Sequence, residues 1–285
     1  MELTKADYNQ LKRDVEKRKQ DFGTTLYHYT SLNTFLRMTK NREIWLSSIG
    51  SMNDSKEISY YVELFEKELS QYKRADFFKK VYDKIESNYK YAFCLSLDKD
   101  DAAQWERYGD SAMGVCIGFN VEEWCKCLYG YPDIMFNSVF YGDSVKEDAY
   151  CHIVKEYFET GKIKIYSSED ELIRQIIYAG NLHKHKSFKN EHEIRITTMD
   201  NDEQDGMKYA LKEIGNVVKK VLVLKLDIMG NLMKTGFEKM IDEIIIGPKS
   251  QQNIDVLQQY VISQGMCDLV NKISKHCFLS FFNEI

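Results

Sequence analysis

Basic residues are not in excess in this sequence. Its 285 residues include 39 Lys and Arg against 44 Asp and Glu, so the formal net charge at pH 7 is −5. Proteins that hold nucleic acid through bulk charge depend on clustered Lys and Arg that release counterions from the phosphates. The composition excludes that mode of binding for the chain as a whole and leaves only local basic grooves.

Long apolar segments are also missing. Val221–Leu226 and Ile244–Ile246 are among the most apolar segments, and both are far shorter than the roughly 20 residues that a helix needs to cross a bilayer. The N-terminus has no basic region followed by an apolar run, which is the pattern of a secretory signal. We therefore expect a cytoplasmic protein without a membrane span.

The composition lacks the marks of disorder and of a disulfide framework. The chain has 19 Tyr, 15 Phe and only two Pro, whereas disordered chains have few aromatic residues and a large charge imbalance. Seven scattered Cys are an odd number, which indicates reduced thiols. We expect an accessory helix at residues 1–22 and one domain over 23–285, with helical insertions at about 55–90 and 144–185.

Several motifs of known sites are absent. No GxGxxG motif follows the first predicted strand, and neither a GxxxxGK[ST] nor a GxSxG motif occurs. The nearest approaches to paired metal ligands are Cys125-Lys-Cys127, Cys151-His152 and His183-Lys-His185. None has the spacing of a zinc finger or zinc ribbon. We therefore expect no metal site, no Rossmann fold and no P-loop.

Short strands and helices follow one another irregularly along the chain. Apolar, β-branched and aromatic runs predict strands at 25–30, 44–47, 91–97, 113–119, 134–141, 193–197, 221–226 and 244–246. Helical periodicity predicts helices at 3–20, after Ser31, and at 55–71, 74–90, 121–129, 144–160, 169–183 and 251–263. Strands 91–97 and 113–119 are expected to pair with each other. This order favours an α+β fold over a doubly wound parallel sheet.

Two acidic residues lie at the start of a late predicted strand. A period of two places Glu191, Glu193 and Arg195 on one face, and Ile194 and Ile196 on the other. The charged face lines either solvent or a polar cleft. An edge strand with a solvated ion pair is the simpler interpretation, because acidic residues are mostly exposed.

A second candidate site lies at the end of the first predicted strand. His28 and Thr30 share one face of this strand, while Tyr27 and Tyr29 share the other. Ser31 can cap the following helix, whose N-terminal N–H groups suit a phosphate or a carboxamide oxygen. The alternative is a buried histidine with a structural hydrogen bond.

A set of short motifs resembles a widespread family of uncharacterised bacterial proteins that is catalogued as a domain of unknown function. The resemblance spans about residues 25–250. The motifs, in chain order, are His28-Tyr-Thr-Ser31, Trp45-Leu-Ser47, Asn53-Asp54-x-x-Glu57, Ser96, Trp105-x-x-Tyr108, Gly114-x-Cys-x-Gly-Phe119, Phe188-x-x-Glu191-x-Glu193-x-Arg195 and Ile246-Gly-Pro248.

A more distant resemblance implies an activity. His-x-Thr at the end of the first strand, together with Glu-Ile-Arg-Ile on the late strand, is similar to ADP-ribosyltransferases of the DarT, RNA 2′-phosphotransferase and diphtheria-toxin-like groups. This resemblance implies an α+β fold with a split, mixed or antiparallel sheet around an NAD cleft. It also implies that His28 contacts an NAD ribose, that Glu193 stabilises the ribose cation, and that Glu191 orients the acceptor.

The same resemblance extends to ligands and partners. The further residues expected to hold NAD are Tyr29, Thr30, Trp45, Ser47 and Tyr108. NAD is then a substrate, and the acceptor is a macromolecule, either nucleic acid or protein. The implied context is a bacterial toxin or anti-phage effector with an antitoxin partner. The alternatives are a module on the same fold that binds a nucleotide or a protein without turnover, and an NAD hydrolase.

Aromatic and basic residues near these motifs are candidates to complete the site. Nicotinamide needs a stacking ring, and the candidates are Trp45, Tyr60, Tyr61 and Tyr108. A nucleic-acid acceptor needs a local groove of Lys and Arg, and the candidates near Glu193 are Lys184, Lys186, Lys189 and Arg195. The ordinary explanation of these basic residues is a solvated face.

Overall fold

The computed structural model describes residues 4–49, 57–87, 91–198, 203–214 and 217–276. It divides the chain into two compact units. The first unit comprises Met1–Leu46, Cys94–Ile134 and Glu203–Ile285, and the second comprises Ser47–Phe93 and Met135–Asp202. Each unit is therefore assembled from segments that are far apart in the sequence. The motif residues Asn53 and Asp54 lie outside the described residues.

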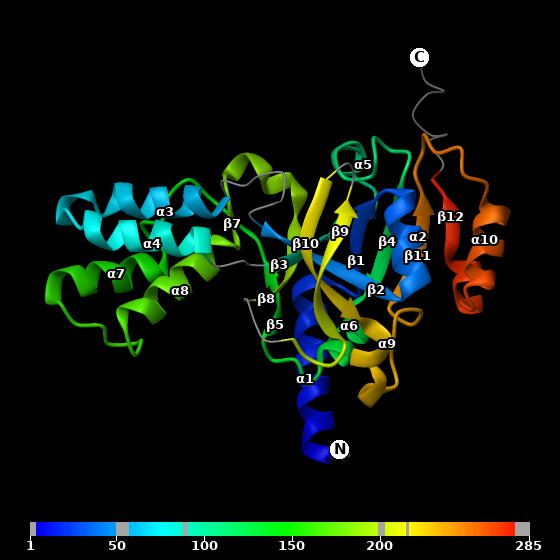
Figure 1. Cartoon of the computed structure of the whole chain (residues 1–285), viewed down its shortest axis with the longest axis horizontal. Helices are drawn as coiled ribbons and strands as arrows, with labels where there is room; N and C mark the ends of the chain where they lie inside the picture. Colours follow the sequence, from blue (N-terminus) through cyan, green and yellow to red (C-terminus); the bar gives the residue numbers. More distant parts are fainter. Residues whose placement is uncertain (1–3, 50–56, 88–90, 199–202, 215–216, 277–285) are drawn as a thin grey trace. The chain divides into compact units, whose positions relative to one another are not determined.

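Both units contain helices (Figure 1). Those of the first unit are α1 (Lys5–Phe22), α2 (Leu32–Asn41), α5 (Ala102–Arg107), α6 (Val121–Leu128), α9 (Leu226–Met229), α10 (Ile254–Ser263) and the 3₁₀ segments η4 (Asn231–Met233) and η5 (Cys267–Lys272). Those of the second unit are α3 (Glu57–Glu68), α4 (Ala75–Ser87), α7 (Ala149–Thr160), α8 (Glu169–Gly180) and the 3₁₀ segments η2 (Ser70–Tyr72) and η3 (Lys186–Glu191).

Both units also contain strands. Those of the first unit are β1 (Thr25–Thr30), β4 (Val115–Asn120), β9 (Met207–Ile214), β10 (Val217–Lys225), β11 (Ile241–Ile246) and β12 (Ile273–Lys275). Those of the second unit are β6 (Phe140–Tyr141), β7 (His183–Lys184) and β8 (Glu193–Thr198), while β2 (Glu43–Ser48), β3 (Tyr91–Ser96) and β5 (Ile134–Ser138) have residues in both. This mixture of helices with a mixed sheet confirms the predicted α+β class.

Strand β1 is an inner strand of the sheet in the first unit. It pairs in antiparallel fashion with β4 over its whole length, from Thr25 to Thr30, and with β3 on its other side. Beyond β4 come β11 and then β12, which runs parallel to β11. The prediction that 91–97 pairs with 113–119 is therefore wrong. Strand β1 lies between them, because its apolar and aromatic residues are compatible with a neighbour on each side.

Strands β9 and β10 form a long antiparallel hairpin in the first unit (Figure 1). Their register runs from Ile214 opposite Val217 to Met207 opposite Leu224. Strand β10 has β2 as its other neighbour, and β9 ends this strand order. An apolar cluster of Trp45, Val221 and Val223, with Ala210 and Ile214 packed against it, covers one face of the hairpin.

The junction of β1 and α2 has the predicted cap. Ser31 has an extended backbone (φ −69°, ψ 153°), and its Oγ accepts a hydrogen bond from the Thr34 N–H at 3.2 Å. A side-chain oxygen at this position satisfies one of the N–H groups that have no partner within the helix. Helix α2 then buries Phe35 and Met38 in the core of the first unit.

The N-terminal helix α1 packs against α6. Its N-cap is Thr4, and its buried side chains include Leu11 and Val15 at helical spacing. Lys19 Nζ also forms an ion pair with Glu122 of α6 at 2.6 Å. The charged helix predicted for the N-terminus is thus fixed by a narrow apolar stripe, as its sequence indicated.

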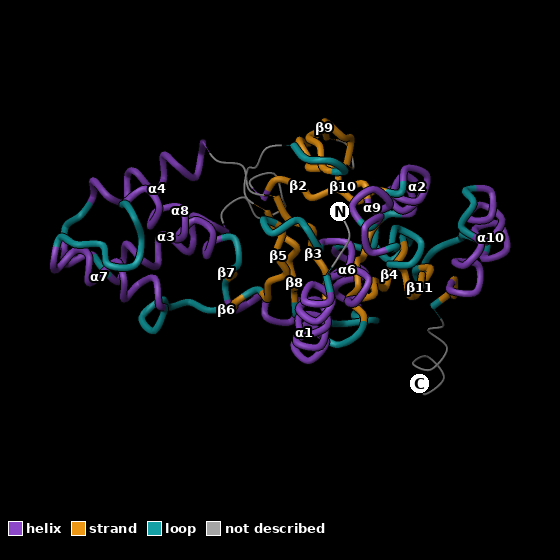
Figure 2. Tube along the Cα trace, turned by 90° about the horizontal axis from the view of Figure 1, so that it is seen from below, coloured by secondary structure: helices purple, strands orange, loops and turns teal. Residues whose placement is uncertain are grey.

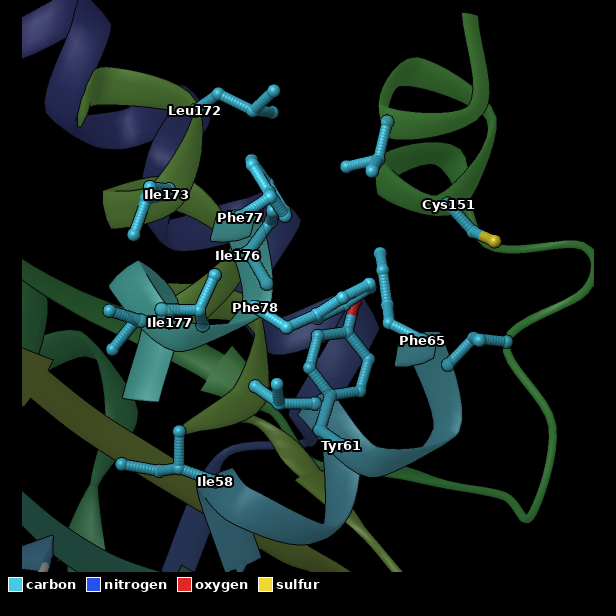
Figure 3. Close-up of a cluster of buried hydrophobic side chains, with 14 of the residues drawn as sticks. Ile58, Tyr61, Phe65, Phe77, Phe78, Cys151, Leu172, Ile173, Ile176 and Ile177 are labelled. Carbon is cyan, nitrogen blue, oxygen red and sulfur yellow. The ribbon is translucent and has the colours of Figure 1, made fainter. Parts of the chain in front are cut away.

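Four helices of the second unit share an apolar core. Helices α3, α4, α7 and α8 lie side by side in Figures 1 and 2, and Figure 3 shows the buried side chains that they direct toward one another. Phe77 of α4 is fully buried, and its ring contacts the rings of Phe78 and Phe158 edge to face, with centroids 5.5 Å and 5.1 Å away. Burial of such aromatic rings contributes much of the stability of a small helical core.

Six cysteines lie in the described part of the chain, and none of them forms a disulfide there. Cys116, Cys127 and Cys151 are buried. Burial raises the pKa of the Cys151 thiol to about 11, so this thiol is a weak nucleophile at neutral pH.

Across the described residues, every helix is too short or too polar to cross a membrane.

Candidate functional site

Five charged side chains come together in the interior of the second unit. They are Glu57, Lys184, Glu191, Glu193 and Arg195, and each is less than 8% exposed. Charged side chains are rarely buried unless they are paired. We call these five residues the ion cluster.

Arg195 connects three parts of the second unit. Its Nε donates to Glu193 Oε1 at 2.8 Å, and one terminal nitrogen donates to Glu57 Oε2 at 2.7 Å. The other terminal nitrogen donates to the backbone oxygen of Asn181, the residue that ends α8. The planar guanidinium group thereby fixes β8, the start of α3 and the end of α8 in one arrangement.

Lys184 contacts all three carboxylates of the ion cluster. Its Nζ lies 2.7 Å from Glu193 Oε2, 2.8 Å from Glu191 Oε2 and 3.2 Å from Glu57 Oε1. Burial opposes the charge on this ammonium group, but the nearby carboxylates outweigh burial, and the pKa of Lys184 is raised. Lys184 therefore remains charged throughout the physiological pH range.

The ion cluster has one more carboxylate than it has cations. With every group ionised, three Glu against Lys184 and Arg195 give a formal charge of −1. Burial raises the pKa of Glu57 despite its contacts with Arg195 and Lys184, so Glu57 is the member that resists ionisation. A buried surplus of negative charge favours a proton or a positively charged group beside it.

Glu191 and Glu193 lie close together, but they do not lie on one strand as predicted. Strand β8 begins at Glu193, Glu191 ends the 3₁₀ segment η3, and His192 between them is left-handed with φ 41°. Both acids nevertheless bind Lys184, so the pair is brought together by a shared cation. Tyr141 also fixes the strand end, because its Oη accepts the Glu193 N–H at 2.8 Å.

The solvated edge strand is an incorrect interpretation, and the solvated basic face describes only Lys186 and Lys189, which are exposed. Strand β8 is buried along its whole length and lies between β5 and β3. Lys184 and Arg195 belong to the ion cluster rather than to an exposed patch, whereas Lys186 is exposed and pairs with Asp143 at 2.6 Å. The charged face of β8 is therefore an interior polar site.

His28 lies in the first unit. It is partly buried, and its Nδ1 is 2.9 Å from the backbone oxygen of Cys94. Burial lowers the pKa of His28 to about 4, so the imidazole is neutral at pH 7, and Nδ1 carries the proton that it donates to this oxygen. These local contacts of His28 are those of the alternative interpretation, a buried histidine with a structural hydrogen bond.

The low pKa of His28 predicts a specific loss of stability in acid. The unfolded chain takes up a proton near pH 6.5, while folded His28 does so only near 4, so the stabilisation is present above pH 6.5 and is lost as the pH falls toward 4. The free energy of unfolding should therefore fall by roughly 2 kcal/mol between pH 7.5 and pH 5.0 because of His28.

Urea unfolding followed by Trp fluorescence tests this prediction, because Trp45, Trp105 and Trp124 all lie in the first unit. The His28→Asn variant lacks the imidazole and should lose less stability than the wild type between the two pH values. Equal losses in both proteins would refute the assigned pKa.

Tyr29 and Thr30 are held in the core of the first unit. The Tyr29 Oη donates to the Asp98 backbone oxygen at 2.9 Å, and its ring contacts Trp105 edge to face at 5.0 Å. The Thr30 backbone lies so close to Gly114 that a Cβ on this glycine would be 2.1 Å from the Thr30 oxygen. Only glycine fits at position 114 without a backbone shift.

A strained turn precedes Gly114. Three consecutive non-glycine residues, Asp110, Ser111 and Ala112, have φ values of 56°, 51° and 68°. Left-handed backbone costs about 1–2 kcal/mol for each such residue, and strained backbone of this kind clusters at functional sites. The Ala112 N–H and the Lys249 N–H both take part in backbone hydrogen bonds of this segment, which hold it in place.

The other predicted NAD ligands differ in accessibility. Trp45 is buried, and its Nε1 donates to Glu43 Oε1 at 2.7 Å. Tyr108, at 37% exposure, follows α5 and is the most accessible of the aromatic candidates that the structure places in the first unit. Ser47 is partly buried in the second unit, where it is paired with Ala92.

The remaining aromatic candidates belong to the second unit. Tyr61 is buried, and its Oη donates to Asp148 Oδ2 at 2.9 Å. Tyr60 is partly buried and donates to the Gly142 backbone oxygen at 3.1 Å. Both phenols are thus held by contacts within their own unit.

The predicted site residues fall into two groups. Glu191, Glu193 and Ser47 belong to the second unit. The residues of the first unit are His28, Tyr29, Thr30, Trp45 and Tyr108. Sequence reasoning did not identify Glu57 or Lys184 as partners of Glu193. In the sequence, Lys184 appears only as a lysine flanked by histidines, and Glu57 only as part of a short acidic motif. Neither pattern is specific for a buried ion cluster.

Within the described residues, no three His, Cys, Asp or Glu side chains are arranged to hold a metal ion.

One protein-family model matches the chain. The model is described as "Protein of unknown function (DUF2971)", and it matches residues 104–196. Tyr108, Glu191 and Glu193 lie within this range, whereas His28 and Trp45 precede it. Neither the curated proteins nor the solved structures contain a match. The predicted likeness to an uncharacterised family is thus confirmed over residues 104–196 alone, where the chain is similar to this family of unknown function.

Proposed function

We propose that this protein is an NAD-dependent ADP-ribosyltransferase that modifies a macromolecule. The observation that supports the proposal is the ion cluster itself, in which three buried carboxyl groups are held in place by two cations. Departure of nicotinamide from NAD leaves positive charge on the ribose. Buried carboxylates held in a fixed geometry stabilise such a charge more strongly than solvated ones do.

The roles follow from the chemistry of the bond that breaks. The bond between the ribose anomeric carbon and the nicotinamide nitrogen breaks, and nicotinamide leaves with the electron pair. A nucleophilic oxygen or nitrogen of the acceptor then bonds to the anomeric carbon and loses its proton. In this proposal Glu193 stabilises the ribose cation, Glu191 orients the acceptor and His28 contacts a ribose of NAD.

A neutral His28 suits this role. With Nδ1 bound to the Cys94 oxygen, the ring orientation is fixed, and an uncharged imidazole does not repel the ribose cation. The proposed context is a toxin or defence effector that an antitoxin restrains.

Replacing Glu193 by Gln should lower ADP-ribose transfer by about 10²–10³-fold, because the variant loses the charge that stabilises the cation. The measurement is incubation of purified protein with labelled NAD and cell lysate, followed by separate protease and nuclease digestion of the labelled product. Glu156→Gln is the matched control, since Glu156 lies on α7 of the same unit and its side chain is 42% exposed.

Full activity of a folded Glu193→Gln protein would refute the assignment. Circular dichroism and a thermal melt establish that the variant is folded. If the wild type released nicotinamide but labelled no macromolecule, water would be the acceptor and the protein an NAD hydrolase.

One observation favours a second candidate, a module that binds a nucleotide or a protein without turnover. Both carboxylate oxygens of Glu193 already accept bonds from Arg195 and Lys184, as expected for a structural ion cluster. This candidate predicts that NAD or a nucleotide binds without nicotinamide release, and that Glu193→Gln leaves the dissociation constant unchanged.

A further inference from the structure

Strand β9 lies at the edge of the sheet in the first unit. Within the described residues it is the last strand of its sheet, and β10 is its neighbour on the inner side. Leu211, near the middle of β9, is 73% exposed, more than any other large apolar side chain in the described part of the chain. An edge strand with an exposed apolar centre is a surface to which another strand can add.

Alternate residues of β9 direct their backbone groups away from β10. The Tyr209 N–H donates to Glu203 Oε1 at 2.9 Å, and Glu203 precedes β9. The Glu213 backbone oxygen accepts a hydrogen bond from Arg37 Nη1 of α2 at 3.0 Å. In an antiparallel ladder, the N–H and C=O of one residue point to the same side, and this side alternates along the strand. Leu211, midway between these two residues, therefore directs its N–H and C=O outward as well.

A second copy of β9 fits this edge in one register. Two antiparallel strands related by a two-fold axis have a central residue that faces its own copy. The centre must direct its backbone groups outward, so within 208–214 it is Tyr209, Leu211 or Glu213. A pair centred on Glu213 would oppose two like charges, and a pair centred on Tyr209 would leave 212–214 beyond the start of the other strand. The pair centred on Leu211 joins the whole of 208–214 to its copy.

The same register brings opposite charges together. Tyr209 of one copy faces Glu213 of the other, because each is two residues from the central Leu211. In the single chain, Glu203 holds the Tyr209 N–H and Arg37 holds the Glu213 oxygen. When these two backbone groups bond to each other across the interface, the carboxylate and the guanidinium group that they release lie side by side and can pair.

The lysines of β9 do not oppose this pairing. Lysines on an edge strand can prevent association, but Lys212 Nζ lies 2.8 Å from Glu43 of β2 and so extends toward the inner strands. In the register centred on Leu211, Lys212 faces Ala210 of the second copy, and Lys208 faces Ile214. No like charges are therefore directly opposed.

We infer that two copies of this protein form a symmetric dimer through β9, with Leu211 on the two-fold axis. The two sheets then continue into each other, and each copy uses the same surface, so the assembly closes at two copies. One strand from each copy is a small contact, and small interfaces give concentration-dependent complexes. The inference goes beyond the proposed function, because the dimer forms without NAD.

Sedimentation velocity of the full-length protein at about 5 to 200 µM tests the dimer. The wild type should shift from monomer toward dimer as its concentration rises. Leu211→Lys opposes two like charges on the axis, so it should weaken dimerisation about 10-fold or more. Val218→Lys is the matched control, since Val218 is 69% exposed on the same hairpin but lies on β10. It should dimerise like the wild type.

An exchange of charges tests the register. Arg37→Glu opposes two carboxylates at each end of the interface, so it should weaken dimerisation roughly 5-fold. The double variant Arg37→Glu/Glu203→Arg restores opposite charges and should recover the dimer. Circular dichroism establishes that each variant is folded.

Four results would overturn the inference. The first is a wild type that stays monomeric at the highest concentration. The second is equal dimerisation of Leu211→Lys and the wild type, and the third is equal weakening by Leu211→Lys and Val218→Lys, which would place the contact on the face of the hairpin instead of its edge. The fourth is a double variant that dimerises no better than Arg37→Glu. Failure of the transfer assay with a normal dimer would count against the proposed function alone.

Discussion

Replacing Arg195 by Met should lower the free energy of unfolding of the second unit by about 3–5 kcal/mol. The variant would leave Glu193 and Glu57 buried beside a single remaining cation, Lys184. Removal of one partner from a buried ion pair is far more costly than loss of a surface pair, because the other charge remains out of water. The backbone oxygen of Asn181 would lose its donor as well.

Hydrogen exchange is the appropriate measurement for this variant. All three Trp residues belong to the first unit, so their fluorescence does not report directly on the ion cluster. Amide protection in β8 and α8 reports local opening free energies. The matched control is Arg174→Met, since the side chain of Arg174 is 50% exposed and pairs with Glu171 on the surface of α8. A surface pair contributes less than about 1 kcal/mol, so similar effects of both substitutions would contradict the role assigned to Arg195.

Replacing Phe77 by Ala should destabilise the helical core of the second unit by about 3–5 kcal/mol. Phe77 is fully buried between the rings of Phe78 and Phe158, and neighbours on several helices restrict how far the core can collapse into the space left behind. The measurement is the change in amide protection of α3, α4 and α8 in urea.

Ile165→Ala provides the control for Phe77→Ala. Ile165 belongs to the same unit but is 65% exposed, so its truncation should change the unfolding free energy by less than about 0.5 kcal/mol. A loss below about 1 kcal/mol for Phe77→Ala would mean that the helices repack without this ring.

Local features of the fold were predictable because they depend only on residues that are close together in the sequence. The strand 25–30 and its Ser31 cap require only a β-branched and aromatic run and a hydroxyl at the right position. Strand partners are not encoded in this way. The sequences of 91–97 and 113–119 each predict a buried strand, but neither sequence indicates that β1 separates the two strands. Pairing depends on the whole sheet, which periodicity does not report.

The candidate site was predictable only in part for a similar reason. A period of two correctly placed Glu193 and Arg195 on one face of a strand, and their ion pair is present. Whether that face is solvated depends on Lys184, from the two-residue strand β7, and on Glu57, from the start of α3. Neither residue stands out in sequence, because a lysine and a glutamate are ordinary surface residues until the tertiary structure buries them.

The order of segments in the first unit affects how the chain folds during synthesis. Strand β4 can pair with β1 soon after it emerges, but its other neighbour, β11, is made much later. At a translation rate of about 5–20 residues per second, one edge of β4 remains unpaired for on the order of ten seconds. The second unit is completed in that interval, since its last segment ends at Asp202. A nascent chain therefore exposes an apolar sheet edge, and slow translation between β4 and β11 should favour aggregation or chaperone binding.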